Sequence, residues 1–355
     1  MVKNVAVNFN HNNKINEKIY PITMKYYQIS ENKKYVDIFR QILYTVNGKN
    51  NNMKLNMIIR EDDKMSRTAI ATDSNSGITQ SRAKKLGVFV LPMSFQVNDK
   101  NYYEEIDLSQ KDFYKLISES KTTVSTTQPS PAELTDFWRK ILKDYDELVY
   151  IPMSSGLSSS CTTASFIAKD FGGRVHVVNN QRISVTQYQS VVDALEMAKQ
   201  GISGKKIKSV LEKETLESSI YITVNDLKYL KKGGRITTAA ALIASVMNLK
   251  PVLQIQGEKL DAFSKCRGMK AAKQIMLDAM HKDFEGRFKE YVEKGEMSLM
   301  YSYSDMPNNE VERWRKEIEA SFPGFRLRGE PLSLSIGCHI GPGSLAIACS
   351  HITKL

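Results

Sequence analysis

Between residues 68 and 179, short apolar runs alternate with amphipathic stretches, and this alternation constrains the fold more than any other feature of the chain. Strands are predicted over residues 68–74, 88–95, 147–154 and 174–179, and helices over 108–119, 131–144 and 158–170. Strands that alternate with helices predict a mostly parallel sheet covered by helices on both faces. Ligands of such sheets bind beyond the carboxyl ends of the strands, so the strand-to-helix loops are the candidate site.

A second region with its own strands begins near Ser219. Strands are predicted over residues 219–224, 250–257, 297–304 and 344–350, and the nearly uncharged stretch Ala239 to Leu249 predicts a helix suited to lining an apolar tunnel. A chain of 355 residues, 41% of them hydrophobic, is long enough for two domains. We therefore expect the α/β fold class, with an N-terminal α/β domain of mostly parallel sheet over residues 67–218 and a C-terminal α/β domain over residues 219–355.

The first 66 residues differ in composition from the rest of the chain. Asn-rich tracts lie at residues 8–13 and 47–52, and residues 1–64 hold 11 Lys or Arg against 6 Asp or Glu. Because nothing in this Asn/Lys-rich stretch carries recognisable chemistry, we expect a poorly ordered N-terminal extension over residues 1–66. The same composition is compatible with a small interaction element, or with a start site placed too early, with Met57 or Met65 as the true initiator.

Charge and composition argue against several classes of function. Roughly half of the formal net charge of +11 lies in the extension, and the remainder comes without a helix-turn-helix pattern or an aromatic and basic ladder. Nucleic-acid binding is therefore not expected. No apolar run approaches the length of a membrane span and no signal-peptide core is present, so a cytoplasmic location is expected. The four cysteines and five histidines show no paired spacing, so neither a disulfide framework nor a metal site is expected.

Two of the strand-to-helix loops are rich in hydroxyl groups. The loop from Ser125 ends in a helix start, where Ser130 caps, Pro131 suits the first helical position and Glu133 completes a capping box. The loop Ser154 to Ser160 also connects a strand to a helix. A helix N-terminus surrounded by hydroxyl groups suits a carboxylate or a phosphate. Taken alone, either loop is better explained by ordinary helix capping.

A third polar feature is His339, which is followed by the turn Gly341-Pro-Gly343 and flanked by two apolar runs that we predict as strands. Glycines let the backbone come close to a ligand, and an imidazole can hydrogen-bond an acidic head group. A single histidine beside a turn is more often structural, so this feature gains weight only together with the two hydroxyl-rich loops.

Seven motifs, taken in order, make this chain resemble the DegV family of bacterial fatty-acid-binding proteins. They are Thr72-Asp-Ser74, Thr126-Thr-Gln-Pro-Ser130, Ser154-Ser-Gly-Leu-Ser158, Leu230-Lys-Lys-Gly-Gly-Arg-Ile236, Leu249-Lys-Pro251, Arg267-Gly268 and His339-Ile-Gly-Pro-Gly343. The resemblance covers residues 67 to 355. It implies two α/β domains with one long-chain fatty acid between them, and a non-catalytic role as the lipid-binding subunit of a fatty acid kinase.

The resemblance also implies partners and site residues. Such a subunit presents the carboxylate of its fatty acid to a separate ATP-dependent fatty acid kinase and holds the acyl-phosphate that forms. Peripheral contact with a membrane is compatible with this role, and no cofactor, metal or catalytic residue is implied. The implied fatty-acid-binding residues are Thr126, Thr127, Ser155, Gly156, Ser158, Arg235 and His339, of which Thr126, Ser158 and His339 bind the carboxylate. Arg267 matches an exposed arginine that docks the kinase.

The chain departs from the family pattern between Asn179 and Tyr188. Thr186 and Tyr188 stand where the family has two close-approach glycines, and Thr127 stands where it usually has serine. We therefore expect a pocket that is narrowed or reshaped in this region. The length and the identity of the lipid are left open.

The alternative function is a serine hydrolase or an acyltransferase. In that case a hydroxyl of the loop Ser154 to Ser158 is the nucleophile and His339 is the base. However, the sequence contains no G-x-S-x-G elbow, and no acid that would orient the histidine is identifiable. We therefore rank the lipid-binding role first.

Overall fold

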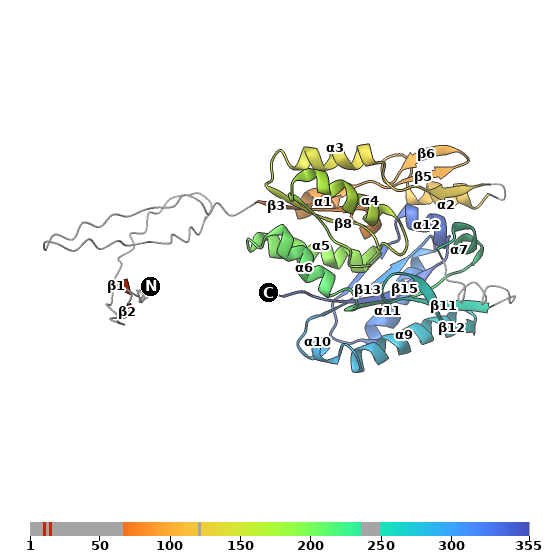
Figure 1. Cartoon of the computed structure of the whole chain (residues 1–355). Helices are drawn as coiled ribbons and strands as arrows, with labels where there is room; N and C mark the ends of the chain where they lie inside the picture. The colour runs from red at the N-terminus through yellow and green to blue at the C-terminus, as the bar shows by residue number, and fades with distance from the viewer. Residues whose placement is uncertain (1–9, 12–13, 16–66, 120–121, 236–248, 355) are drawn as a thin grey trace, which may run out of the picture. The chain divides into compact units, whose positions relative to one another are not determined.

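The computed structural model describes residues 10–11, 14–15, 67–119, 122–235 and 249–354 (Figure 1). Contacts divide the chain into Met1–Lys64 and Met65–Leu355. In the described part of the first unit, β1 (Asn10–His11) pairs with β2 (Lys14–Ile15) in antiparallel fashion. The rest of the predicted extension lies outside the described residues. So does the predicted helix over Ala239 to Leu249, apart from Leu249, which begins a strand.

The predicted parallel sheet is confirmed. Four strands run in the order β4-β3-β8-β9, and every pair of neighbours is parallel. The strands are β3 (Thr68–Asp73), β4 (Phe89–Leu91), β8 (Glu147–Ile151) and β9 (Val175–Val177). Helices cover both faces, because residues that alternate along each strand enter two separate hydrophobic clusters. Ala69 and Ala71 pack with α3 (Pro131–Ile141) and α4 (Ser160–Ile167), whereas Ile70 packs with α1 (Gln80–Leu86), α5 (Ser184–Lys199) and α6 (Gly204–Lys213).

The helices of this region begin and end as follows: α1 (Gln80–Leu86), α2 (Gln110–Ile117), α3 (Pro131–Ile141), α4 (Ser160–Ile167), α5 (Ser184–Lys199) and α6 (Gly204–Lys213), with short 3-10 turns at Ser74–Ser76 (η1) and Ala168–Phe171 (η2). The capping box predicted for α3 is present. Ser130 accepts a hydrogen bond from the backbone N–H of Glu133, whose carboxylate accepts one from the backbone N–H of Ser130.

The apolar run 88–95, which we predicted as one strand, contains two strands in different sheets. Pro92 lies at the break, because proline has no N–H to continue a sheet ladder. After it, β5 (Ser94–Val97) forms a three-stranded antiparallel sheet with β6 (Lys100–Tyr103) and β7 (Val124–Thr126). Helix α2 packs on this small sheet.

The second half of the described chain forms a six-stranded mixed sheet in the order β12-β11-β10-β15-β13-β14, in which only β13 and β14 are parallel neighbours. Its strands are β10 (Ser218–Thr223), β11 (Leu249–Ile255), β12 (Leu260–Arg267), β13 (Met297–Tyr303), β14 (Leu327–Pro331) and β15 (Leu345–His351). Its helices are α7 (Lys228–Gly233), α9 (Met269–Glu285), α10 (Lys289–Glu293), α11 (Asn308–Ser321) and α12 (Leu334–Ile340).

The two faces of this sheet have different neighbours. Along β15, Ile347 packs with α9 and α11, whereas Ala346 and Ala348 face the opposite way, toward α5, α7 and α12. Helix α5 therefore packs against both the parallel sheet and the six-stranded sheet (Figure 1). Because residues 65–355 form one compact unit, the division into domains at residue 218 stays a prediction.

The apolar run before His339, which we predicted as a strand, instead forms helix α12 (Leu334–Ile340). Ser333 caps this helix by accepting a hydrogen bond from the backbone N–H of Ile336, and Gly341 follows its end. Short apolar runs do not distinguish strand from helix, since period alone cannot decide over so few residues. Gly337 lets α12 approach helix α2, because an added Cβ there would lie 2.7 Å from the Tyr114 hydroxyl oxygen.

Among the described residues, no helix is long and apolar enough to cross a membrane. The four cysteines are free thiols, three of them buried.

Candidate functional site

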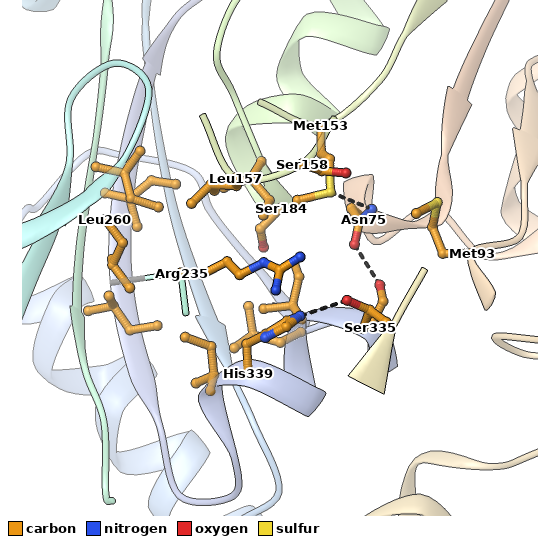
Figure 2. Close-up of a pocket in the computed structure, with 18 of the residues that line it drawn as sticks. Asn75, Met93, Met153, Leu157, Ser158, Ser184, Arg235, Leu260, Ser335 and His339 are labelled. Carbon is orange, nitrogen blue, oxygen red and sulfur yellow. Dashed lines mark hydrogen bonds between the residues drawn. The ribbon is translucent and has the colours of Figure 1, made fainter. Parts of the chain in front are cut away.

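A cavity lies against the α5 face of the six-stranded sheet and extends to the loops that follow β3, β7 and β8 (Figure 2). Its volume is about 870 Å³, including the part open to solvent. This lies within the usual range of ligand pockets, about 300–1,000 Å³. Its apolar lining includes Ile183, Ile220, Ile222, Leu230, Leu260 and Ile336. The cavity is therefore suited to an apolar ligand.

The polar part of the lining contains five of the seven residues that we predicted as the fatty-acid site. They are Thr126, Thr127, Ser158, Arg235 and His339. The loops and helices that supply them are far apart in the sequence, and the fold brings them to one cavity. The other two predicted residues, Ser155 and Gly156, lie in the turn after β8 and are not among the lining residues.

Gly156 instead permits close packing of the β11–β12 hairpin. A Cβ atom at this position would lie 2.3 Å from the carbonyl oxygen of Glu258. The same carbonyl accepts a hydrogen bond from the hydroxyl of Ser154 at 2.9 Å. The loop after β8 is thus fastened to the hairpin that carries Leu260 of the cavity wall.

His339 lies in the last turn of α12 and pairs with Thr126 at the end of β7. Its Nε2 is 2.8 Å from the Thr126 Oγ1, and either atom could be the donor, depending on the histidine tautomer. Burial, and then the positive charge of Arg235, lower the pKa of His339 to about 4. The imidazole is therefore neutral near pH 7 and can donate one hydrogen bond and accept one.

Gly233, the last residue of α7, fixes the position of this ring. A Cβ atom at Gly233 would lie 2.2 Å from the Nδ1 of His339, so no larger residue fits there without moving the imidazole. The Nδ1 atom is buried and has no hydrogen-bond partner among the described residues. No carboxylate therefore orients His339 within that part of the chain, as the hydrolase alternative would need.

Arg235 follows the C-terminal end of α7 and is exposed. Its guanidinium donates a hydrogen bond to the carbonyl oxygen of Gly233 at 2.5 Å. In the view of Figure 2, its side chain reaches into the cavity between Ser184 and His339. The charge can therefore act on any acidic group held there.

The remaining predicted hydroxyls form local pairs. The Ser158 Oγ is 2.8 Å from the Ser160 Oγ and also accepts a hydrogen bond from the backbone N–H of Ser160, the first residue of α4. The Thr127 Oγ1 lies 2.7 Å from the Ser94 Oγ. Each hydroxyl has further hydrogen-bonding capacity for a ligand, because a hydroxyl is one donor and two acceptors.

A buried polar network that we did not predict contacts the N-terminal end of α12. The Glu104 carboxyl accepts hydrogen bonds from the Ser74 hydroxyl at 2.6 Å, from the backbone N–H of Leu334 and, more weakly, from the Ser335 hydroxyl at 3.4 Å. Ser335 in turn donates to the Asn75 Oδ1 at 2.6 Å, and both of these residues line the cavity. Burial raises the pKa of Glu104 to about 8, so its carboxyl is mostly protonated near pH 7.

The departures at Thr186 and Tyr188 do not line the cavity. The Thr186 hydroxyl donates to the carbonyl oxygen of Ile183 at 2.9 Å. The Tyr188 ring contacts two guanidinium groups, with Arg328 3.6 Å and Arg82 4.9 Å from its centroid. Thr186 thus bonds within the start of α5, whereas Tyr188 contacts residues of α1 and β14, and the cavity wall near them is formed by Ile183 and Ser184.

Sequence reasoning missed Asn75, Ser184, Ser302 and Ser335 as lining residues. A usable signal existed for Ser335, which lies four positions before the predicted site residue His339. Residues four apart share one face of a helix and also one face of a strand. Within the described ranges, no group of three His, Cys, Asp or Glu side chains could hold a metal ion.

Comparisons with known proteins agree with the resemblance in the sequence. A family model described as "Uncharacterised protein, DegV family" matches residues 67–351. A DegV domain-containing protein of Caldanaerobacter subterraneus subsp. tengcongensis is 31% identical over 290 residues, which span 80% of this chain and 98% of that protein. The solved structure described as "Fatty Acid Binding of a DegV family Protein from Thermus thermophilus" has a TM-score of 0.73 and 28% identity, over 80% of this chain and 99% of that one. The structure of DegV, a fatty acid binding protein from Bacillus subtilis, has a TM-score of 0.69 and 24% identity, over 81% and 99%, and supports the fold.

Proposed function

Because the chain belongs to the DegV family, we propose that it binds one long-chain fatty acid in the cavity between α5, α12 and the six-stranded sheet. The acyl chain lies along the isoleucine and leucine side chains of the wall, where burial of apolar surface provides most of the affinity. The family membership and the binding of fatty acid by the Thermus thermophilus relative support this proposal.

The carboxylate of the fatty acid is bound by Thr126, Ser158 and His339, with Arg235 beside it. The observation that supports this most is the pairing of Thr126 with His339 on the lining of an otherwise largely apolar cavity. A carboxylate taken out of water needs such partners, because an unpaired buried charge is costly. The neutral imidazole of His339 can donate one hydrogen bond to this carboxylate.

Binding of a fluorescent fatty acid to single variants tests this arrangement. Thr126→Ala, Ser158→Ala and His339→Ala each remove one partner of the carboxylate, and we expect each to weaken binding by about 1–3 kcal/mol. Ser165→Ala is the matched control, because the Ser165 hydroxyl bonds the carbonyl oxygen of Cys161 on the same helix and does not line the cavity. If all three variants bind as tightly as the control, the carboxylate lies elsewhere.

We further propose that the chain is a non-catalytic subunit that presents the carboxylate to a separate ATP-dependent fatty acid kinase and holds the acyl-phosphate product. Arg267, exposed at the end of β12, docks the kinase. A planar guanidinium pairs well with carboxylates on a partner's surface.

A reconstituted kinase assay with Arg267→Ala tests the docking role. Acyl-phosphate formation should fall while lipid loading stays intact. Lys265→Ala is the matched control, because Lys265 lies two residues earlier on the same strand and face and is also exposed. A parallel loss of loading and turnover in Arg267→Ala would assign the residue to the pocket.

A further inference from the structure

Two serine hydroxyls of the cavity, those of Ser184 and Ser302, have no hydrogen-bond partner among the described residues. Both residues line the cavity, and both are buried, with exposed fractions of 7% and 2%. The third buried serine of the lining, Ser335, differs because its hydroxyl is already bonded to Asn75. Neither hydroxyl oxygen is among the fully buried atoms that lack a partner, so both oxygens face the open space of the cavity, where a polar group of a ligand can pair with them.

Ser184 is held in the cavity wall by an unusual backbone. It is the first residue of α5 and has φ of 55°, the left-handed region that side chains other than glycine rarely adopt. Its neighbours Ile183 and Val185 belong to the apolar cluster of the six-stranded sheet. In Figure 2 the Ser184 side chain points into the cavity above Arg235. Strain of this kind is found where the surrounding structure holds a residue for function.

Ser302 lies on the cavity side of β13. Its neighbour across one side of the strand is Ala346 of β15, which offers no side-chain partner. Its neighbour on the other side is Glu330 of β14, whose Oε1 accepts hydrogen bonds from the guanidinium groups of Arg82 and Arg328, each at 2.5 Å, and which makes no hydrogen bond to Ser302. The protein therefore leaves the Ser302 hydroxyl free to bond a ligand.

The carboxylate of the fatty acid does not account for these two groups, since it already has Thr126, Ser158 and His339 as partners in the proposed function. We infer that the cavity takes a fatty acid whose acyl chain carries a hydroxyl group, and that Ser184 and Ser302 hydrogen-bond to this group. The inference rests on the proposed function and adds the class of lipid. A hydroxyl suits both serines, because it donates one hydrogen bond and accepts two.

Competition binding with the delipidated full chain tests the inference. Stearate is compared with three hydroxystearates that carry the hydroxyl near the carboxyl end, at mid-chain and near the tail. One of the three should bind the parent about tenfold more tightly than stearate, as expected for hydrogen bonds made to an otherwise buried polar group. This ratio should fall in Ser184→Ala and in Ser302→Ala, and should approach one in the double variant.

Two further variants keep the test informative. Ser184→Gly removes the hydroxyl while suiting the left-handed backbone, so it should lose the preference even if Ser184→Ala folds poorly. Ser298→Ala, on the same strand as Ser302 but outside the cavity lining, should keep the full ratio. The inference is overturned if no hydroxystearate binds more tightly than stearate, which would mean that water pairs with the serines, or if the preference survives in the double variant. If the parent binds neither stearate nor any of the three hydroxystearates, the proposed function itself is overturned.

Discussion

Replacing Glu104 by glutamine should make the protein more stable at alkaline pH. Glu104 is 3% exposed, and its carboxyl bonds the start of α12, the helix that carries His339. Burial raises its pKa from an ordinary value of 4.5 to about 8. Glutamine has the same shape, keeps an oxygen for the Leu334 N–H and can donate to the hydroxyls that the protonated carboxyl faces. It cannot ionise.

The expected size of the effect follows from this pKa. Between pH 4.5 and 8 the folded chain keeps the Glu104 proton and the unfolded chain does not. The contribution of Glu104 to the unfolding free energy is therefore fully present below pH 4.5 and is lost as the pH rises through about 8. Each pKa unit corresponds to about 1.4 kcal/mol, so the full loss is about 5 kcal/mol and the part between pH 6 and 8 is about 2 kcal/mol. Glu104→Gln should lack this part of the pH dependence.

Urea unfolding of the parent and of Glu104→Gln at pH 6, 7 and 8 measures the difference. Other groups with perturbed pKa values, such as Asp193 at about 7 and His339 at about 4, titrate in both proteins and cancel in the comparison. Glu119→Gln, which changes an exposed glutamate, should follow the parent at every pH. A difference in unfolding free energy between the parent and Glu104→Gln that stays constant from pH 6 to 8 would refute the reasoning.

Two glycine substitutions test the close contacts around the cavity. Gly233→Ala places a Cβ 2.2 Å from the His339 Nδ1, so fatty-acid affinity in a fluorescence titration should fall about tenfold, or about 1.4 kcal/mol. This loss is expected although Gly→Ala in a helix usually stabilises the protein. The control Lys232→Ala, on the exposed side of α7, should bind fatty acid normally. Equal affinities of the two variants would contradict the contact. Gly156→Ala meets the Glu258 carbonyl oxygen at 2.3 Å and should lower the unfolding free energy by about 1–3 kcal/mol, whereas Ser155→Ala in the same turn should not. A melting temperature of Gly156→Ala equal to that of the parent would show that the hairpin moves freely.

Local patterns in the sequence were sufficient for much of the fold. The alternation of strands and helices predicted the parallel sheet, and Ser130 with Glu133 predicted the start of α3, because both features depend on neighbouring residues. Helix α12 was predicted wrongly as a strand, since seven residues are too few for the helical period to be distinguished.

The site could be predicted only in part, because its contacts join distant segments. His339 and Thr126 are 213 positions apart, and Ser335 and Asn75 are 260 positions apart. A family resemblance supplied the first pair. The spacing of Ser335 from His339 places both on one helix face, but no local pattern joins Ser335 to Asn75. The unpaired hydroxyl of Ser184 was likewise hidden, because the sequence does not reveal a left-handed backbone at a serine.

Native mass spectrometry of the protein purified from bacterial cells tests the central claim most directly. An apolar cavity with carboxylate partners should retain its ligand through purification, so we predict about one fatty acid for each chain, released and identified on denaturation. His339→Ala should carry clearly less. A parent protein with no bound acyl chain, which also takes up no added palmitate or oleate, would contradict the account.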